Sequence, residues 1–103
     1  MTQAELLAAC KLACRITATA LDSEISDLID SAFLDLEISG VSDNTGTPYS
    51  VATADQLVAT AVKTYVKIHL GDLLDEATAK RLEESYWYQK AQLKMRVHSE
   101  PES

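Results

Sequence analysis

The sequence predicts a small all-α domain: a short first helix, two central helices and a long C-terminal helix, with one long loop. Apolar residues recur at helical spacing in four segments, and no segment alternates apolar and polar residues over the length of a strand. The chain of 103 residues holds only three Gly and two Pro, and its many Ala, Leu, Glu and Lys residues favour helix. We expect a single domain over residues 1–98 and a flexible tail over 99–103.

The first helix is expected from Thr2 or Gln3 to Cys14. Leu6, Cys10 and Cys14 share one face at helical spacing. A helix of this length is marginal alone in water, so we expect it to pack on the rest of the chain.

The second helix has the clearest apolar stripe. Thr19 is the expected N-cap, with Asp22 three residues later in the position of a capping-box acid, and Gly40 is expected to end the helix. The stripe consists of Leu21, Ile25, Leu28, Ile29, Ala32 and Leu36. The opposite face is acidic, and the helix contains no basic residue.

Residues 40–52 are rich in Gly, Ser, Thr, Asn and Pro, which is typical of a loop. Thr53 and Gln56 then fit a capping box that opens the third helix, which Gly71 closes. Apolar side chains, Leu57 among them, cover more than half of its circumference. We therefore expect the third helix to be the central one.

The fourth helix is expected from Asp72 or Asp75 to Val97. Its narrow core stripe is Ala79, Leu82, Tyr86, Leu93 and Val97, and a second apolar line is Trp87, Tyr88, Ala91 and Met95. Two apolar lines on one helix indicate two packing partners, one of them another subunit.

The formal net charge is −7, and all of it belongs to residues 1–62, which hold nine acidic and two basic side chains. Proteins that grip nucleic acid usually carry the opposite sign, because phosphate contacts need Lys and Arg. No apolar run approaches the roughly 20 residues of a membrane span, and the N-terminus lacks the pattern of a signal peptide. We expect a protein made in a cytosol with no membrane partner.

The sequence offers no convincing catalytic, cofactor or metal site, so an enzyme is not expected. Cys10 and Cys14 could supply zinc ligands with His69 or His98, and a small metalloenzyme is the corresponding alternative. Both cysteines lie on the apolar stripe of their helix, which favours buried structural thiols. His69 falls within the apolar arc of the third helix and is expected in the core or at an interface. The carboxylates of the second helix lack the turn of a calcium loop.

Self-assembly is the function that the surface pattern favours. Leu34 and Ile38 are neighbours on the acidic, outward face of the second helix. The end of the fourth helix is basic, and it could meet the acidic second helix of a neighbouring copy, a head-to-tail contact that builds rings. The predicted interface residues are Glu24, Asp27, Leu34, Asp35, Ile38, Trp87, Lys90, Lys94, Met95 and Arg96.

The order of these features resembles a known family. The stretches "KLACRIT", "LDSEISDLIDSA", "AVKTYVKIHLGD" and "RLEESYWYQKAQLKM" follow one another with a polar loop before the third. This succession, from about Leu6 to Met95, resembles the small head–tail connector (head-completion or adaptor) proteins of long-tailed bacteriophages and their prophages. The loop over residues 41–52 departs from the compact members, so its contacts are left open.

The resemblance implies a structural subunit of the virion head–tail junction, assembled in the cytoplasm of a bacterial host. It implies a dodecameric ring under the portal protein that extends the DNA channel and receives the next connector, stopper or tail protein. DNA would pass without specific binding, and an acidic wall suits such passage. Lys63 and Lys67 could face a neighbour or the DNA in the lumen. A dimeric, antitoxin-like regulatory protein is the alternative.

Overall fold

The computed structural model describes residues 2–17, 19–43, 45–70 and 75–99, with side chains up to residue 95. Within these described residues four helices follow one another, α1 (Gln3–Cys14), α2 (Asp22–Ile38), α3 (Gln56–Leu70) and α4 (Glu76–Ser99). Within the described ranges there is no strand, and one isolated backbone bridge joins Ser42 to Pro48. The predicted all-α fold is confirmed. Helix α4 reaches one residue into the predicted tail, while Gly71, Asp72 and residues 100–103 lie outside the described residues.

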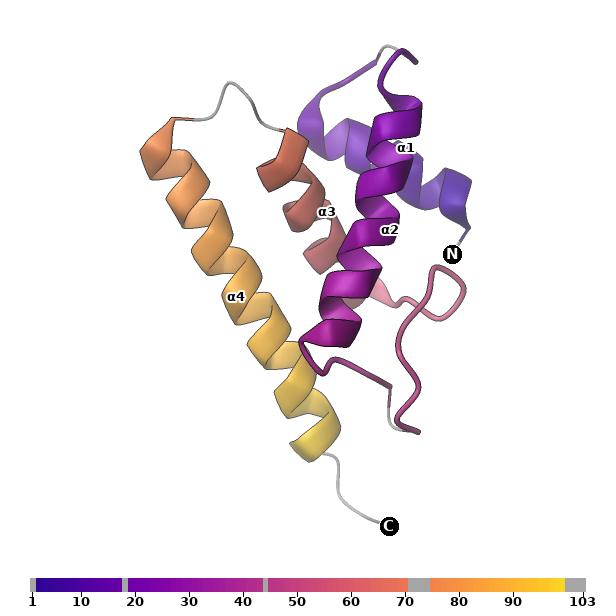
Figure 1. The fold of residues 1–103 in the computed structure, drawn as a ribbon, viewed down its shortest axis with the longest axis vertical. Helices are drawn as coiled ribbons and strands as arrows, with labels where there is room; N and C mark the ends of the chain where they lie inside the picture. The colour runs from indigo at the N-terminus through magenta and orange to yellow at the C-terminus, as the bar shows by residue number, and fades with distance from the viewer. Residues whose placement is uncertain (1, 18, 44, 71–74, 100–103) are drawn as a thin grey trace.

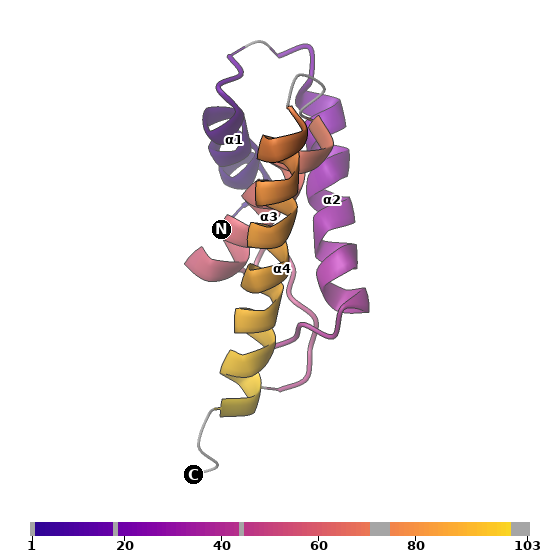
Figure 2. The ribbon, with the colours of Figure 1, turned by 90° about the vertical axis from the view of Figure 1, so that its left-hand side faces the viewer.

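Helix α3 is the central element, as its wide apolar arc predicts. It contacts each of the other three helices, whereas α4 packs chiefly on α3. Helix α1 crosses behind α2 in Figure 1 and contacts it, and in the perpendicular view the two lie on either side of α3 (Figure 2). The buried residues of α3 are Val58, Ala59, Ala61, Val62, Thr64 and Val66. Burial on several sides of one helix lets it serve as the common packing partner.

The remaining core comes from the predicted stripes and from Val41, which was predicted in the loop. It contains Leu6, Cys10, Ile25, Ile29, Ala32, Leu36, Val41, Tyr86 and Leu93. Three expected positions are corrected. Leu21 and Leu57 are 36% and 48% exposed, and His69, which falls within the apolar arc, is exposed in the last turn of α3 and so does not lie in the core. Leu21 and Leu57 occupy the first turns of their helices, where the neighbouring elements no longer cover them.

The helix starts differ from the predictions at two of four places. At α1, Thr2 and Glu5 form a reciprocal capping box, with the Thr2 amide 2.8 Å from Glu5 Oε1. Helix α2 has Leu21 at its N-cap without a side-chain cap, so the expected Thr19 cap is wrong. Thr19 contributes only its carbonyl, which accepts a hydrogen bond from the Asp22 amide.

Aspartates cap the two later helices. The Asp55 carboxylate accepts a hydrogen bond from the Val58 amide at 3.0 Å, so the expected Thr53 cap of α3 is also wrong. Thr53 instead accepts a hydrogen bond from the amide of Ser50 in the preceding turn. Asp75, one of the two predicted starts of α4, accepts from the Thr78 amide. Carboxylates at N-caps also interact favourably with the helix dipole.

The C-terminus of α2 ends at the predicted glycine. Gly40 has φ +88°, and the amides of Gly40 and Val41 donate to the carbonyls of Glu37 and Leu36. This is the Schellman arrangement, which needs a left-handed residue that glycine adopts without strain. Val41 is buried, so the chain enters the following loop from a fixed point.

Within the loop, Asp43 organises the tip. Its carboxylate accepts hydrogen bonds from the amides of Thr45 and Thr47 and from the Thr45 hydroxyl. These bonds lower the pKa of Asp43. Tyr49, Val51 and Ala54 pack against the core beyond the tip. The described helices include none that is long and apolar enough to cross a membrane.

Candidate interaction surface

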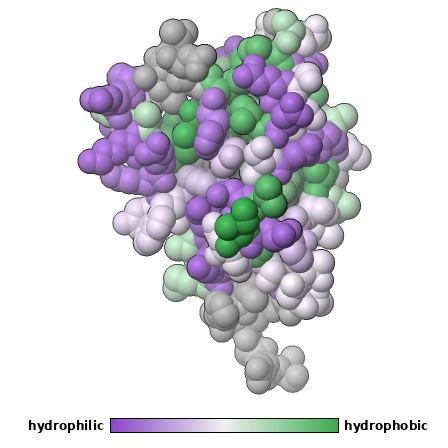
Figure 3. All heavy atoms as spheres, viewed as in Figure 1, coloured by the Kyte–Doolittle hydropathy of each residue, from purple (hydrophilic) through white to green (hydrophobic). Residues whose placement is uncertain are grey.

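The outer side of α2 carries the two exposed apolar residues that the sequence singled out. Leu34 is 56% exposed and Ile38 is 74% exposed. In the space-filling view a hydrophobic patch lies over the C-terminal half of α2, bordered by hydrophilic surface (Figure 3). Neighbouring helices do not cover this patch, as the prediction of an outward-facing pair required.

Helix α4 exposes its second apolar line. Trp87, Tyr88 and Met95 are 62%, 64% and 67% exposed. The rings of Trp87 and Tyr88 meet edge to face with centroids 5.3 Å apart. An aromatic pair left in water on a helix surface is typical of a protein-binding surface, where rigid rings bury a large area at little entropic cost.

A groove runs between α4 and the C-terminal end of α2. Its volume is about 280 Å³, and it is lined by Ser39, Trp87, Lys90, Ala91 and Lys94. Trp87 and Ala91 give the groove apolar surface, and Lys94 gives it a positive charge, while Lys90 is paired with Asp35. Ala91 permits the hollow, because a longer side chain at this position of α4 would fill it. Ser39 was not among the predicted residues, since its small side chain gives no hydropathy signal.

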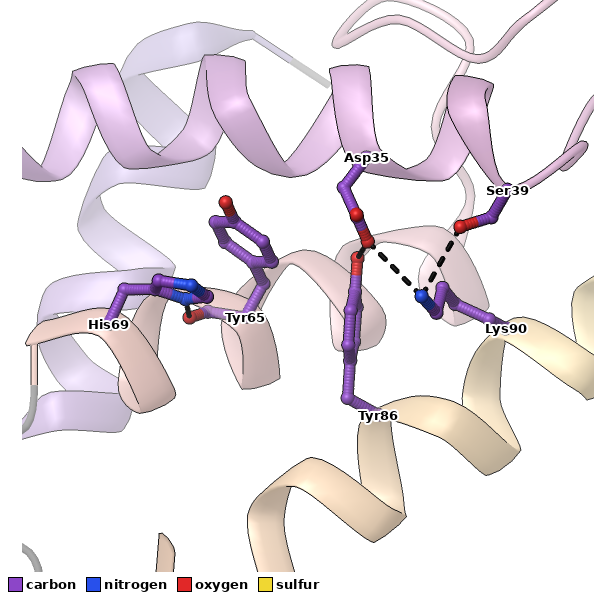
Figure 4. Close-up of polar contacts among 6 residues, drawn as sticks. All are labelled: Asp35, Ser39, Tyr65, His69, Tyr86 and Lys90. Atoms are coloured by element: carbon purple, nitrogen blue, oxygen red, sulfur yellow. Dashed lines mark hydrogen bonds and ion pairs between the residues drawn. The ribbon is translucent and has the colours of Figure 1, made fainter.

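A polar cluster joins α2 to α4 beside this groove (Figure 4). The Tyr86 hydroxyl donates a hydrogen bond to Asp35 Oδ2 at 2.5 Å. Lys90 Nζ lies 3.3 Å from the same oxygen and 3.2 Å from Ser39 Oγ. It also lies 4.7 Å from the centre of the Tyr86 ring. Asp35 and Lys90 therefore find partners of opposite charge inside one chain, a role that was predicted for contacts between copies.

The environment of Tyr86 favours its neutral hydroxyl. Burial is the largest cause of a raised pKa, and the hydrogen bond and negative charge of Asp35 add to it. Tyr65 contacts the Tyr86 ring edge to face and stacks on His69, whose Nδ1 lies 2.9 Å from the Tyr65 carbonyl. Burial also raises the pKa of Tyr65. The neutral Tyr86 hydroxyl donates the hydrogen bond to Asp35 that joins α4 to α2.

The other predicted interface residues lie on exposed surface. Glu24 and Asp27 are exposed on α2, and Lys94 is exposed at the wall of the groove. The side chain of Arg96 lies outside the described residues. Lys63 and Lys67 are half-buried on α3, close enough to α1 for their charges to act on the thiols of Cys10 and Cys14.

The cysteines are free thiols, Cys10 buried and Cys14 half-buried. Burial raises the pKa of Cys10 to about 11 and that of Cys14 to a lesser degree, with Lys63 and Lys67 opposing the shift. Their helical stripe predicted this burial. No group of three or more His, Cys, Asp or Glu residues that could hold a metal ion occurs in the described part of the chain.

A second, smaller groove lies on the other flank of α4, against the first turns of α3. Its volume is about 130 Å³, and it is lined by Leu57, Thr60, Gln89, Gln92 and Leu93. Gln89 Oε1 is buried there and has no hydrogen-bond partner among the described residues. This groove could not be predicted from the sequence, because glutamines carry neither charge nor apolar periodicity. Leu12, 81% exposed on α1, was also missed, although it lies off the stripe of Leu6 and Cys10.

Comparison with known proteins agrees with the resemblance drawn from the sequence. A family model described as phage connector protein matches residues 6–101, which include α1 from Leu6 onward, α2, α3, α4 and both grooves. No curated protein and no solved structure matches the chain. The match covers nearly the whole chain, so the exposed surfaces described above are those of a structural protein of the phage head–tail junction that contacts other phage proteins. The chain belongs to the phage connector protein family.

Proposed function

We propose that the chain is the subunit of a ring that sits under the portal protein, extends the DNA channel and receives the next connector, stopper or tail protein. The observation that carries this proposal is the family match together with the uncovered groove between α2 and α4. A dodecameric ring would follow the symmetry of the portal. The subunit acts through contacts, with no substrate and no cofactor.

The two flanks of α4 support a ring. One flank carries the basic, aromatic groove with Trp87 and Lys94, and the other carries the amide-lined groove with Gln89 and Leu57. Contacts in a closed ring are heterologous, so each subunit needs two unlike surfaces. A chain with one exposed patch alone would be limited to a two-fold pair.

The charge of the chain supports passage of DNA without capture. A net charge of −7 repels phosphate, and few lysines remain outside ion pairs and grooves. Lys63 and Lys67 are the cations on α3 that would face either the lumen or a neighbour. A salt-dependent, tight affinity of the protein for duplex DNA would contradict this part of the proposal, and a gel-shift series at two salt concentrations measures it.

Electron microscopy of the concentrated protein, with and without its portal, tests the ring. We expect rings on the portal vertex, because the portal supplies a platform that a marginal contact between subunits needs. A chain that binds no portal and stops at two copies under all conditions would instead support the regulatory, antitoxin-like alternative.

Surface variants locate the contact. The double variant Leu34→Gln, Ile38→Gln should abolish or sharply weaken attachment of the protein to the portal, because it removes exposed apolar area without touching the core. Leu12→Gln is the matched control on α1, at 81% exposure. Both proteins should unfold within about 0.5 kcal/mol of the wild type. If the wild type, the double variant and Leu12→Gln attach to the portal equally well, the assignment of the Leu34 and Ile38 face to this contact is contradicted.

A further inference from the structure

The outer side of α2 carries a stripe of two halves. Glu24, Asp27, Leu34 and Ile38 lie at i, i+3, i+10 and i+14, which places them on one line of the helix surface. The N-terminal half of the line is acidic and the C-terminal half is apolar. All four side chains are exposed.

The groove lies beside the apolar half of this stripe. Lys90 contacts Asp35 and Ser39, which follow Leu34 and Ile38 by one position and so lie about 100° round the helix from them, on the side of α2 that faces α4. The groove therefore borders the apolar half of the stripe. Figure 3 views this face, with α2 standing forward of α4 as Figure 2 shows. The face therefore presents a ridge, α2, next to a positively charged hollow along α4.

These features are self-complementary. A two-fold turn about an axis near Leu34 lays the two α2 helices antiparallel. Each acidic half, with Glu24 and Asp27, then lies over the basic groove of the other copy, and the apolar halves meet at the axis. Ridges that fit into grooves are the usual way in which helical surfaces pack. We propose that two copies of the chain pair face to face in this way, covering Leu34, Ile38 and Trp87 in each.

Charge decides between this pair and a head-to-tail chain of copies. An acidic patch and a basic groove on different flanks would let each copy bind two neighbours. Here the groove adjoins the stripe along α2, so a single partner lying across α2 occupies both, and association closes at two. The pair covers the groove that the ring of the proposed function uses, so a copy must leave its partner before it joins the ring. The pair is therefore a state of the protein away from the portal.

Charge reversal combined with sedimentation equilibrium tests the pair. We expect the wild type to reach twice the 11.3 kDa chain mass as its concentration rises. Glu24→Lys with Asp27→Lys should weaken dimerisation at least about tenfold, because like charges then oppose each other at two symmetric places. This variant changes the net charge from −7 to −3, each reversal adding two units. A smaller net negative charge reduces the repulsion between two copies and would by itself strengthen dimerisation. Weaker dimerisation of this variant therefore reports the loss of the local contact between the acidic half of α2 and the groove.

Lys94→Glu should weaken dimerisation in the same way, and its mixture with the Glu24→Lys, Asp27→Lys variant should restore a species of two chains. Lys80→Glu is the matched control, an exposed lysine fourteen residues earlier on α4, about 21 Å along the helix. It should leave the dimer unchanged. Circular dichroism of each variant checks that the fold is retained.

Three outcomes would overturn the inference: a wild type that stays monomeric at high concentration, an undiminished dimer in the Glu24→Lys, Asp27→Lys variant, or a mixture that grows beyond two chains. Portal attachment is scored separately by electron microscopy. Rings without dimers would refute the pair alone, and dimers without portal attachment would refute the proposed function alone.

Discussion

Removal of a single hydroxyl tests whether the Asp35 cluster holds α4 against α2. Tyr86→Phe keeps the buried ring and deletes the donor of the 2.5 Å hydrogen bond to Asp35. Hydrogen bonds to charged groups contribute about 1.5–3 kcal/mol. The Asp35 side chain is 36% exposed, so water can partly replace the lost donor. We therefore expect a loss of about 1 kcal/mol in the free energy of unfolding.

Urea denaturation followed by circular dichroism at 222 nm measures this loss. The midpoint should fall by roughly 0.3–1 M and the melting temperature by about 4–8 °C. Tyr88→Phe is the control, since Tyr88 is 64% exposed and its change should stay within about 0.5 kcal/mol. A Tyr86→Phe protein as stable as this control would refute the view that the cluster fastens α4.

The same variant has a distinct pH dependence. The pKa of Tyr86 is raised in the folded protein, so the folded state keeps the hydroxyl proton where the unfolded chain, with a value near 10, has lost it. The contribution of Tyr86 is complete below about pH 10 and declines as pH rises above it. The stability difference between wild type and Tyr86→Phe should accordingly be constant from pH 7 to 9 and shrink above pH 10. An increase of that difference in alkali would contradict the assigned cause.

Three further changes are expected to act locally. Gly40→Ala should cost about 1 kcal/mol in chemical denaturation, because φ +88° strains any residue with a Cβ, and an unchanged midpoint would contradict this. A thiol reagent at pH 8 should label native Cys14 well before buried Cys10, so Cys14→Ser should remove the fast phase and Cys10→Ser should leave it. Asp43→Ala should speed amide hydrogen exchange at Thr45, and equal exchange rates would show that the carboxylate does not hold the loop tip.

The helices and their inward faces could be predicted from the sequence because hydrophobic periodicity reports which side of a helix is buried. The stripe through Ile25, Ile29 and Leu36 needs no knowledge of its partner. Gly40 was equally informative, since a left-handed end position favours one residue type. The caps at Thr19 and Thr53 failed for a local reason. Several nearby residues can cap a helix, and packing of the adjoining turns selects among them.

The exposure of Leu34 and Ile38 was predictable, whereas the partners of the charged residues were not. Leu34 and Ile38 are off the core stripe, and this alone places them outside. The contact of Lys90 with Asp35 spans 55 residues of sequence and depends on how α4 lies across α3. Sequence patterning gives each charge a helical face but does not say whether the facing helix belongs to the same chain. The groove is likewise a property of two helices together.

The loop between α2 and α3 is fixed at its ends and open at its tip. Buried Val41 anchors one end, and Val51 and Ala54 pack on the core at the other. At Gly46 an added Cβ would meet nothing within 4 Å. Lengthening a loop between fixed ends costs little, because closure entropy grows only with the logarithm of length. The tip of this loop can therefore be lengthened, shortened or decorated independently of the helices, and the position next to Gly46 is suited to carry an inserted peptide tag or fluorophore.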